Sequence, residues 1–185
     1  MIDDRALASN VAQGNRHAFE QLIRQHQRLV VHMVGRIVGN REDLEEICQD
    51  VFVKVHEKIG EFNFQSKLST WIATIAYRQA INHLRKRKIE VSELADEKNF
   101  EKQFIAFDQP DEALEDHDME ELVLKLIEKL PAHYRVVVTL YHLEDMNYAE
   151  IGEATGMPEG TVKNYLFRAR QLLKEKIKMY LGKEV

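Results

Sequence analysis

Apolar residues recur every three or four positions along most of this chain, which is the spacing of helices with one buried face. The pattern is cleanest between Asn40 and Gly60, where the apolar face is formed by Leu44, Ile47, Cys48, Val51, Phe52, Val55 and Ile59. A long helix is predicted before it, ending near Gly39, and a short helix between Asp3 and Gly14. Eight glycines and three prolines are too few for a turn-rich β protein. The sequence therefore predicts an all-α fold.

A further helix is predicted to lead into a cluster of cations. Its core-facing residues are Leu68, Trp71, Ile72, Ile75, Ala76 and Leu84, and Ser69 or Thr70 could cap its start. The other side carries Arg78, Gln79, Asn82, His83 and Arg85, followed by Lys86, Arg87 and Lys88. Arg, Asn and Gln suit base edges, and clustered cations suit phosphates. A solvated basic helix end, favoured by the helix dipole, explains the same residues equally well.

The loop before this helix contains two aromatic residues and several polar ones in a segment too short to form a core. Its residues are Phe62, Asn63, Phe64, Gln65, Ser66 and Lys67. The phenylalanines could simply tuck under the helix. Alternatively, flat side chains and amides could form a pocket for an unstacked base of single-stranded nucleic acid.

The helix between Asn40 and Gly60 has a polar face dominated by carboxylates. This face carries Glu42, Asp43, Glu45, Glu46, Gln49, Asp50 and Lys54. A solvated surface is the simplest explanation of such a strip.

Near the C-terminus, the spacing predicts a helix-turn-helix. Asn147 and Glu150 fit a capping box, and Gly156 would end a short helix. A turn through Met157–Gly160 leads into a second helix whose buried residues are Val162, Leu166, Ala169 and Leu173. Its exposed residues are Thr161, Lys163, Asn164 and Arg168, which suit the major groove of DNA. A hairpin packed for purely structural reasons is the alternative.

The net charge of −5 is unevenly distributed. Residues 89–118 contain about 11 acidic and 2 basic side chains, which leaves about −9 there and about +4 elsewhere. We therefore expect two small helical domains, 1–88 and 118–185, joined by an acidic flexible linker, 89–117. One cysteine excludes an internal disulfide, and no apolar run is long enough to insert in a membrane. A cytoplasmic protein without a cofactor or metal is expected.

The order of these segments resembles the extracytoplasmic-function group of bacterial RNA polymerase sigma factors. The segments that carry the resemblance are DLEEICQDVFVKV, FNFQSKLSTWIATIAYRQAINHLRKRK and LPAHYRVVVTLYHLEDMNYAEIGEATGMPEGTVKNYLFRARQLL. The resemblance implies a first domain that binds the clamp helices of the largest polymerase subunit and opens the −10 promoter element. It implies a second domain that docks on the flap of the second-largest subunit and reads the −35 element. An anti-sigma protein is a further implied partner.

The resemblance assigns roles to individual residues. Glu45, Glu46, Gln49 and Asp50 match the polymerase-binding face. The loop 62–67 matches the pocket for a flipped promoter base, and Arg78 and Asn82 match promoter-facing positions. Lys163, Asn164, Phe167 and Arg168 match groove-facing positions. Many relatives resemble GTVKSRL where this chain reads GTVKNYL, so its preferred upstream sequence is open.

Two other classes of function are possible for a chain with these segments. An enzyme is not expected, because the chain has no phosphate-binding glycine loop and its eight histidines lack metal-ligand spacing. A helix-turn-helix repressor or activator acting as a dimer is the alternative. A dimeric repressor or activator would give no role to the carboxylate strip or to the basic helix that leads into Lys86, Arg87 and Lys88.

Overall fold

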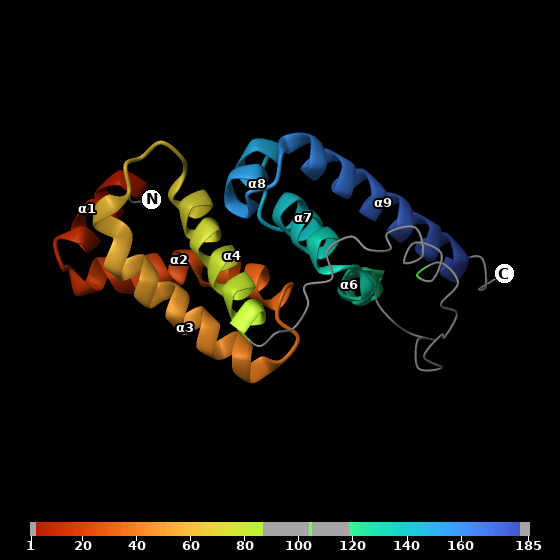
Figure 1. Cartoon of the computed structure of the whole chain (residues 1–185), viewed down its shortest axis with the longest axis horizontal. Coiled ribbons are helices and arrows are strands. Elements are labelled where there is room, and N and C mark those ends of the chain that lie inside the picture. The colour runs from red at the N-terminus through yellow and green to blue at the C-terminus, as the bar shows by residue number, and fades with distance from the viewer. Residues whose placement is uncertain (1–2, 87–103, 105–118, 182–185) are drawn as a thin grey trace.

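The computed structural model describes residues 3–86, 104 and 119–181, and within these ranges the chain forms eight α-helices and one 3-10 turn but no strand (Figure 1). The first domain consists of α1 (Asp4–Ala12), α2 (Arg16–Gly35), α3 (Arg41–Lys58), the 3-10 turn η1 (Ile59–Glu61) and α4 (Leu68–Lys86). The second consists of α6 (Met119–Lys129), α7 (Ala132–His142), α8 (Tyr148–Thr155) and α9 (Glu159–Leu181). The all-α prediction is confirmed.

Asparagine caps set the starts of the two long helices in the first domain. The Asn15 side chain accepts a hydrogen bond from the Ala18 amide at 3.1 Å, and Asn40 accepts one from the Asp43 amide at 2.7 Å. The apolar faces of α2 and α3 then meet α4, which packs against both. Side chains with no exposed surface at the centre of this domain are Leu22, Val30, Val34, Val51, Val55, Leu68 and Ile72.

The structure corrects the expected start of α4. The helix begins at Leu68, and the Lys67 carbonyl accepts a hydrogen bond from the Trp71 amide at 3.1 Å. Neither Ser69 nor Thr70 is therefore its N-cap. Of the six predicted core residues, Leu68, Ile72, Ala76 and Leu84 are buried, whereas Trp71 and Ile75 are half-buried.

In the second domain, α9 packs against α6, α7 and α8. The predicted capping box at α8 is confirmed, since Asn147 and Glu150 exchange hydrogen bonds of 2.8 and 3.0 Å. Gly156 ends α8 with a φ of 77°, a left-handed conformation that glycine adopts without strain. The turn is shorter than predicted, because α9 already begins at Glu159.

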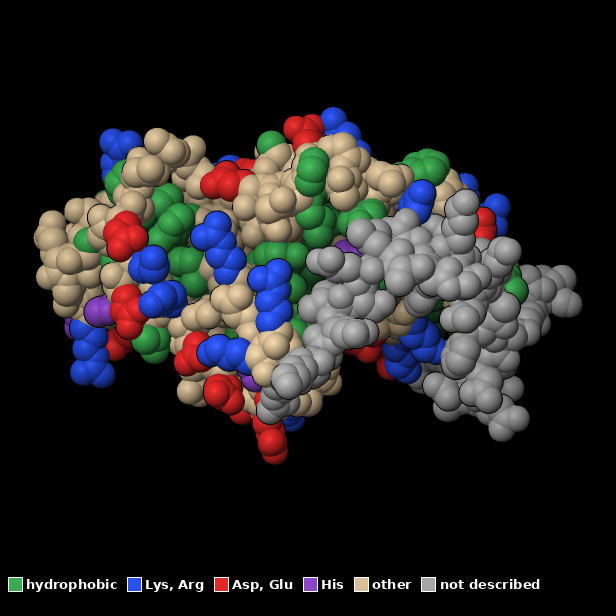
Figure 2. All heavy atoms as spheres, in the orientation of Figure 1, with side chains coloured by type: hydrophobic (Ala, Val, Ile, Leu, Met, Phe, Trp, Pro, Cys, Tyr) green, Lys and Arg blue, Asp and Glu red, His purple; other side chains and the backbone are tan. Residues whose placement is uncertain are grey.

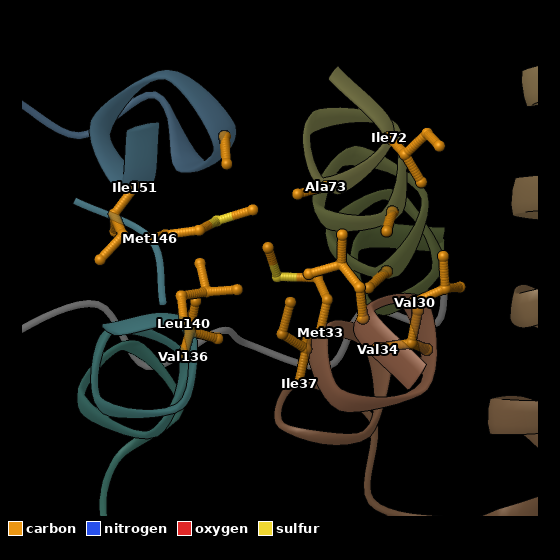
Figure 3. Packing of buried hydrophobic residues seen from close by; sticks show 14 of the residues in the cluster. Val30, Met33, Val34, Ile37, Ile72, Ala73, Val136, Leu140, Met146 and Ile151 are labelled. Atoms are coloured by element: carbon orange, nitrogen blue, oxygen red, sulfur yellow. The ribbon is translucent and has the colours of Figure 1, made fainter. Parts of the chain in front are cut away.

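Helix α7 is enclosed on both sides. Five consecutive residues, Val136 to Leu140, are each 3% exposed or less. One side of α7 faces α9 and another faces α2 of the first domain, so the helix has no solvent face over this stretch. The two domains thus pack against each other, α2 on α7 and α4 on α8 (Figure 3).

The predicted acidic linker, 89–117, lies outside the described residues except for Phe104, whose side chain is 5% exposed. Among the helices of the described ranges, none has both the length and the apolar character that a bilayer crossing requires.

Candidate nucleic-acid and partner interfaces

The loop between η1 and α4 places its two phenylalanines in different environments. Phe62 is buried and lies 5.3 Å from the Trp71 ring, centroid to centroid. Phe64 packs on Phe62 at 4.7 Å but remains 38% exposed. The Asn63 side chain accepts a hydrogen bond from the Gln65 amide at 3.2 Å, which tightens the turn. Phe62 is thus packed under the helix, which was the simpler of the two expectations. Phe64 instead keeps one face of its ring free to contact another flat group.

Phe64 also has an unusual backbone conformation and an unexpected neighbour. Its φ of 60° lies in the left-handed region, which is costly for a bulky side chain and is found preferentially at functional sites. The Arg5 guanidinium lies 4.9 Å from the centre of the Phe64 ring. Sequence reasoning missed Arg5, because nothing in its local pattern indicates that α1 packs beside η1.

The outer face of α4 carries most of the predicted promoter-facing residues. Arg78, Asn82, Arg85 and Lys86 are exposed and Gln79 is half-buried, while Arg87 and Lys88 lie outside the described part of the chain. Lys and Arg side chains are spaced along the face where α4 runs (Figure 2). The helix therefore presents cations and an amide to solvent.

Two residues expected on polar faces instead join α3 to α4. His83 is half-buried, with Nε2 3.3 Å from a carboxylate oxygen of Asp43. Asp43 is 6% exposed and also accepts a hydrogen bond of 2.5 Å from the Asn40 side chain. The prediction that His83 belongs to the cationic face is therefore wrong, as is the placement of Asp43 on a solvated one.

The remaining carboxylate strip of α3 is open to solvent. Its residues Glu45, Glu46, Gln49 and Asp50 are all exposed. Glu45 pairs with Arg41 at 3.1 Å, whereas neither Glu46 nor Asp50 has an ion-pair partner within the described ranges.

An apolar residue extends this strip and was missed. Val53 is 57% exposed and follows Asp50 by three positions and Glu46 by seven, so the three lie on one face of α3. The detectable signal was a valine at a position that the helical period assigns to the polar face. A single exposed valine is common on protein surfaces, so Val53 adds an apolar contact to this face but does not by itself define a binding site.

Cys48, on the inner side of α3, is half-buried, and burial raises its pKa to about 11. The thiol is therefore protonated at neutral pH, which agrees with a packing role.

At the start of α9, Lys163 and Asn164 are exposed, Phe167 is 62% exposed, and Thr161 and Arg168 are half-buried. Lys163 Nζ lies 2.7 Å from a Glu159 carboxylate oxygen, and this hydrogen bond raises the lysine pKa. Lysine, an amide and an aromatic ring thus project from the first turns of α9, where a recognition helix contacts base edges.

Asn164 and Tyr165, the two residues at which this chain departs from the GTVKSRL pattern, lie in different environments. Asn164 faces solvent, but Tyr165 is 7% exposed. The Tyr165 ring lies 4.6 Å from His133 and 5.2 Å from Tyr134, centroid to centroid. Tyr165 is therefore part of the domain core, and only Asn164 changes the outer surface.

A helix-turn-helix with this outer surface, joined to a second helical domain that exposes cations and an aromatic loop, is the architecture of a two-domain DNA-binding transcription factor. Family comparison agrees: residues 22–89 match "Sigma-70 region 2" and residues 120–173 match "Sigma-70, region 4". The sequence is 31% identical over 182 residues to the "ECF RNA polymerase sigma-E factor" of Haemophilus influenzae, covering 95% of this chain and 96% of the relative. It is 30% identical to the "RNA polymerase sigma-H factor" of Pseudomonas aeruginosa, covering 92% and 91%.

The chain belongs to the sigma-70 family, in its extracytoplasmic-function group. It is a sigma factor that directs transcription initiation and is not an enzyme, and the dimeric repressor or activator is not favoured.

Solved structures show the same fold. The sigma factor RpoE from Bartonella quintana, in complex with the anti-sigma factor NepR, has a TM-score of 0.64 at 21% identity, covering 86% of this chain and 96% of that one. CnrH in complex with the cytosolic domain of CnrY has a TM-score of 0.61 at 18% identity, covering 95% and 97%.

Proposed function

We propose that the first domain binds the clamp helices of the largest polymerase subunit through Glu45, Glu46, Gln49 and Asp50, with Val53 as an apolar contact. The observation that carries this assignment is the exposed face of α3, where Glu46 and Asp50 lack ion-pair partners in the described ranges. Unpaired carboxylates steer a basic partner, and the exposed apolar side chain at the end of the strip adds desolvated contact area. The second domain docks on the flap of the second-largest subunit.

The −10 element is opened by the loop 62–67 together with α4. The exposed ring of Phe64 offers a stacking face for an extruded base, and Asn63, Gln65 and Ser66 supply polar groups around it. The cations and amides of α4, together with the two cations that follow it in the sequence, hold the separated strand: Arg78, Gln79, Asn82, Arg85, Lys86, Arg87 and Lys88.

The −35 element is read as duplex by Thr161, Lys163, Asn164, Phe167 and Arg168. The exposed amide of Asn164 can form a bidentate contact with adenine, and the Phe167 ring can contact a thymine methyl group. Lys163 must exchange its bond with Glu159 for a contact with DNA.

The domains extend over 1–88 and 118–185, with residues 89–117 as the tether. We further propose an anti-sigma protein as partner, supported by the two structural neighbours, both of which are complexes of this kind.

The polymerase assignment is tested by reversing charge on the strip. Glu46→Lys with Asp50→Lys should weaken binding to core polymerase by at least about tenfold, or about 1.4 kcal/mol, because repulsion replaces attraction. Core affinity is measured by fluorescence anisotropy of the labelled chain, and folding by circular dichroism.

A matched control carries Asp3→Lys with Asp4→Lys, two exposed carboxylates at the start of α1 and outside the α3 strip, and therefore the same change in net charge. The control should retain core binding. Equal affinities for the strip variant and the wild type would remove α3 from the polymerase interface.

A further inference from the structure

The first turn of α1 places an arginine over the ring of the loop 62–67 that stays exposed. The Arg5 guanidinium carbon lies 4.9 Å from the centre of the Phe64 ring. A guanidinium is attracted to the negative face of an aromatic ring, and its planar shape lets it stack there. The contact joins two elements that are far apart in the sequence, α1 and the loop before α4.

The packing of α1 fixes the position from which Arg5 projects. Leu7, Ala8 and Val11 on the inner side of the helix are each 2% exposed or less. The helix packs on α2 and on η1, the turn that leads directly into the loop. Arg5 itself is exposed. Its backbone is therefore held in place, while its side chain faces solvent beside the loop.

The loop side of this contact is equally constrained. The Asn63 side chain accepts a hydrogen bond from the Gln65 amide across residue 64, and the buried Phe62 ring lies 4.7 Å from the Phe64 ring. These contacts hold Phe64 at a φ of 60°, a conformation that a bulky side chain rarely adopts. Phe64 is still 38% exposed, so part of its ring remains open beside the guanidinium.

Arg5 has no carboxylate partner. Asp3 and Asp4 precede it, but within the described ranges no carboxylate lies within ion-pair distance of its guanidinium. The N–H donors of a stacked guanidinium point outward from its edge, so they stay available to an anion. Lys67, the cation of the loop itself, is already paired, with Nζ 2.7 Å from a carboxylate oxygen of Glu150 in α8.

An extruded nucleotide carries both groups that Phe64 and Arg5 can bind. Its base can stack on the open part of the ring, and its phosphate is an anion that a guanidinium binds through short, bidentate hydrogen bonds. A single sugar joins the base to the phosphate, so the cation has to lie next to the stacking ring. Arg5 satisfies this condition because it lies on the ring itself.

We propose that Arg5 is a further DNA-contacting residue, which binds the phosphate of the extruded promoter nucleotide whose base stacks on Phe64. This assignment rests on the proposed role of the loop 62–67 as the pocket for that base. The ring orients the guanidinium before DNA arrives, so less side-chain freedom is lost on binding. Asp3 and Asp4 repel other phosphates, so α1 contributes one contact and not a broad basic surface.

The test measures how holoenzymes with wild-type or variant chains bind a fork-junction DNA, by fluorescence anisotropy. The DNA has a sequence selected by the wild-type holoenzyme, and its −10 segment is single-stranded. Arg5→Met removes the charge but keeps a flexible apolar side chain over Phe64. It should weaken binding by about tenfold and lower the slope of log affinity against log salt by about 0.7, the value for one phosphate of a single strand.

Neutral phosphates locate the contact along the strand. Phosphates of the −10 segment are replaced one at a time by methylphosphonate, which carries no charge. Each contacted phosphate should weaken wild-type binding when replaced, but at one of them Arg5→Met should lose no further affinity. Arg5→Lys should restore the salt slope but not the full affinity, because an ammonium group binds phosphate as a point charge.

Arg16→Met is the matched control for the loss of one positive charge. Arg16 is exposed, follows the opposite end of α1 from Arg5, and pairs with Glu20 at 3.2 Å. The control should keep the affinity and the salt slope of the wild type. Arg5→Met should keep the wild-type affinity for core polymerase and the wild-type circular dichroism, since the residue is exposed.

The inference is overturned if Arg5→Met binds the fork junction as tightly as the wild type. It is also overturned if binding weakens while the salt slope and the methylphosphonate profile stay as in the wild type, because Arg5 would then be purely structural.

Phe64→Gly separates this inference from the proposed function, because glycine adopts the same φ without the ring. Weaker binding with Phe64→Gly but not with Arg5→Met rejects only the role of Arg5. Unchanged binding with Phe64→Gly rejects the loop as the pocket, and the role of Arg5 with it.

Discussion

Residues 164 and 165 show how neighbours in sequence can have unrelated roles. Asn164 points to solvent from the recognition helix, while Tyr165 packs against Tyr134 and His133. The helical period separates these roles, since consecutive positions are about 100° apart around the axis. A change at 164 therefore alters the solvent-facing surface of α9, and a change at 165 alters how α9 packs on α7.

Substituting Asn164 should change sequence preference more than affinity. Asn164→Ser removes the amide that can pair with adenine, so discrimination at one upstream base should shift by about 1–3 kcal/mol with unchanged thermal stability. Selection from randomised duplexes by the holoenzyme measures the preference. Gln171→Ser, an exposed amide farther along α9, is the control. Identical selected sequences for Asn164→Ser and wild type would place Asn164 away from the bases.

Exposure of single side chains was predictable where it follows from the helical period. Glu46, Asp50, Lys163 and Asn164 are all exposed as expected. The contacts made by Arg5 with Phe64 and by His83 with Asp43 were not predictable, because each joins different elements. Periodicity gives the side of a helix on which a residue lies, but the identity of its neighbour depends on how helices cross.

At the scale of elements, caps and glycines determine where helices start and stop. The Asn147–Glu150 box starts α8 and Gly156 ends it, both as predicted, whereas the cap that Asn40 forms at the start of α3 was not predicted. Gly152 has a role that was not predicted. An added Cβ at this position in α8 would lie 2.9 Å from the Met157 carbonyl oxygen, so the turn can fold back closely only over a glycine.

Gly152→Ala should therefore destabilise the second domain although alanine is the better helix former. Overpacking against a backbone oxygen should cost about 1–3 kcal/mol, more than the gain of about 1 kcal/mol in helix propensity. Urea denaturation followed by circular dichroism measures the free energy of unfolding. Gly160→Ala in α9, where no atom lies within 4 Å of the added Cβ, should be neutral or stabilising. If both variants unfold at the same urea concentration, the close approach has no energetic importance.

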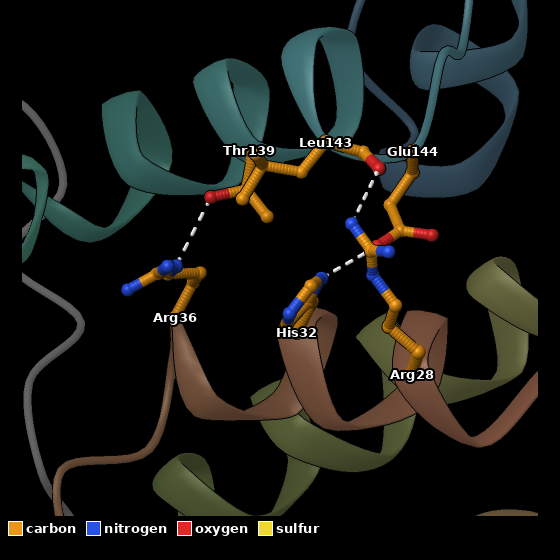
Figure 4. Close-up of polar contacts among 6 residues, drawn as sticks. All are labelled: Arg28, His32, Arg36, Thr139, Leu143 and Glu144. Carbon is orange, nitrogen blue, oxygen red and sulfur yellow. Dashed lines mark hydrogen bonds and ion pairs between the residues drawn. The ribbon is translucent and has the colours of Figure 1, made fainter. Parts of the chain in front are cut away.

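At the scale of the whole molecule, the two domains were predictable and their packing was not. Met33 fits the apolar stripe of α2 and Ile37 continues it just beyond the end of the helix, but the stripe does not reveal that part of it meets the second domain. Two features of the sequence are consistent with this packing of the domains. Arg28, His32 and Arg36, which contact the second domain (Figure 4), repeat every four residues, and four of the five residues from Val136 to Leu140 are apolar.

The apolar centre of the interdomain contact also has a chemical consequence, because two of its side chains are thioethers. Met33 and Met146 are 1% and 4% exposed, whereas Met179 at the end of α9 is 38% exposed. Dilute peroxide should therefore oxidise Met179 faster than Met33 or Met146 in the folded protein, as measured by peptide mass spectrometry.

Equal oxidation rates at Met33, Met146 and Met179 would show that the interdomain contact does not protect the two buried thioethers. A sulfoxide at Met33 or Met146 would be polar where the contact is apolar, so oxidation there would weaken the packing of the two domains.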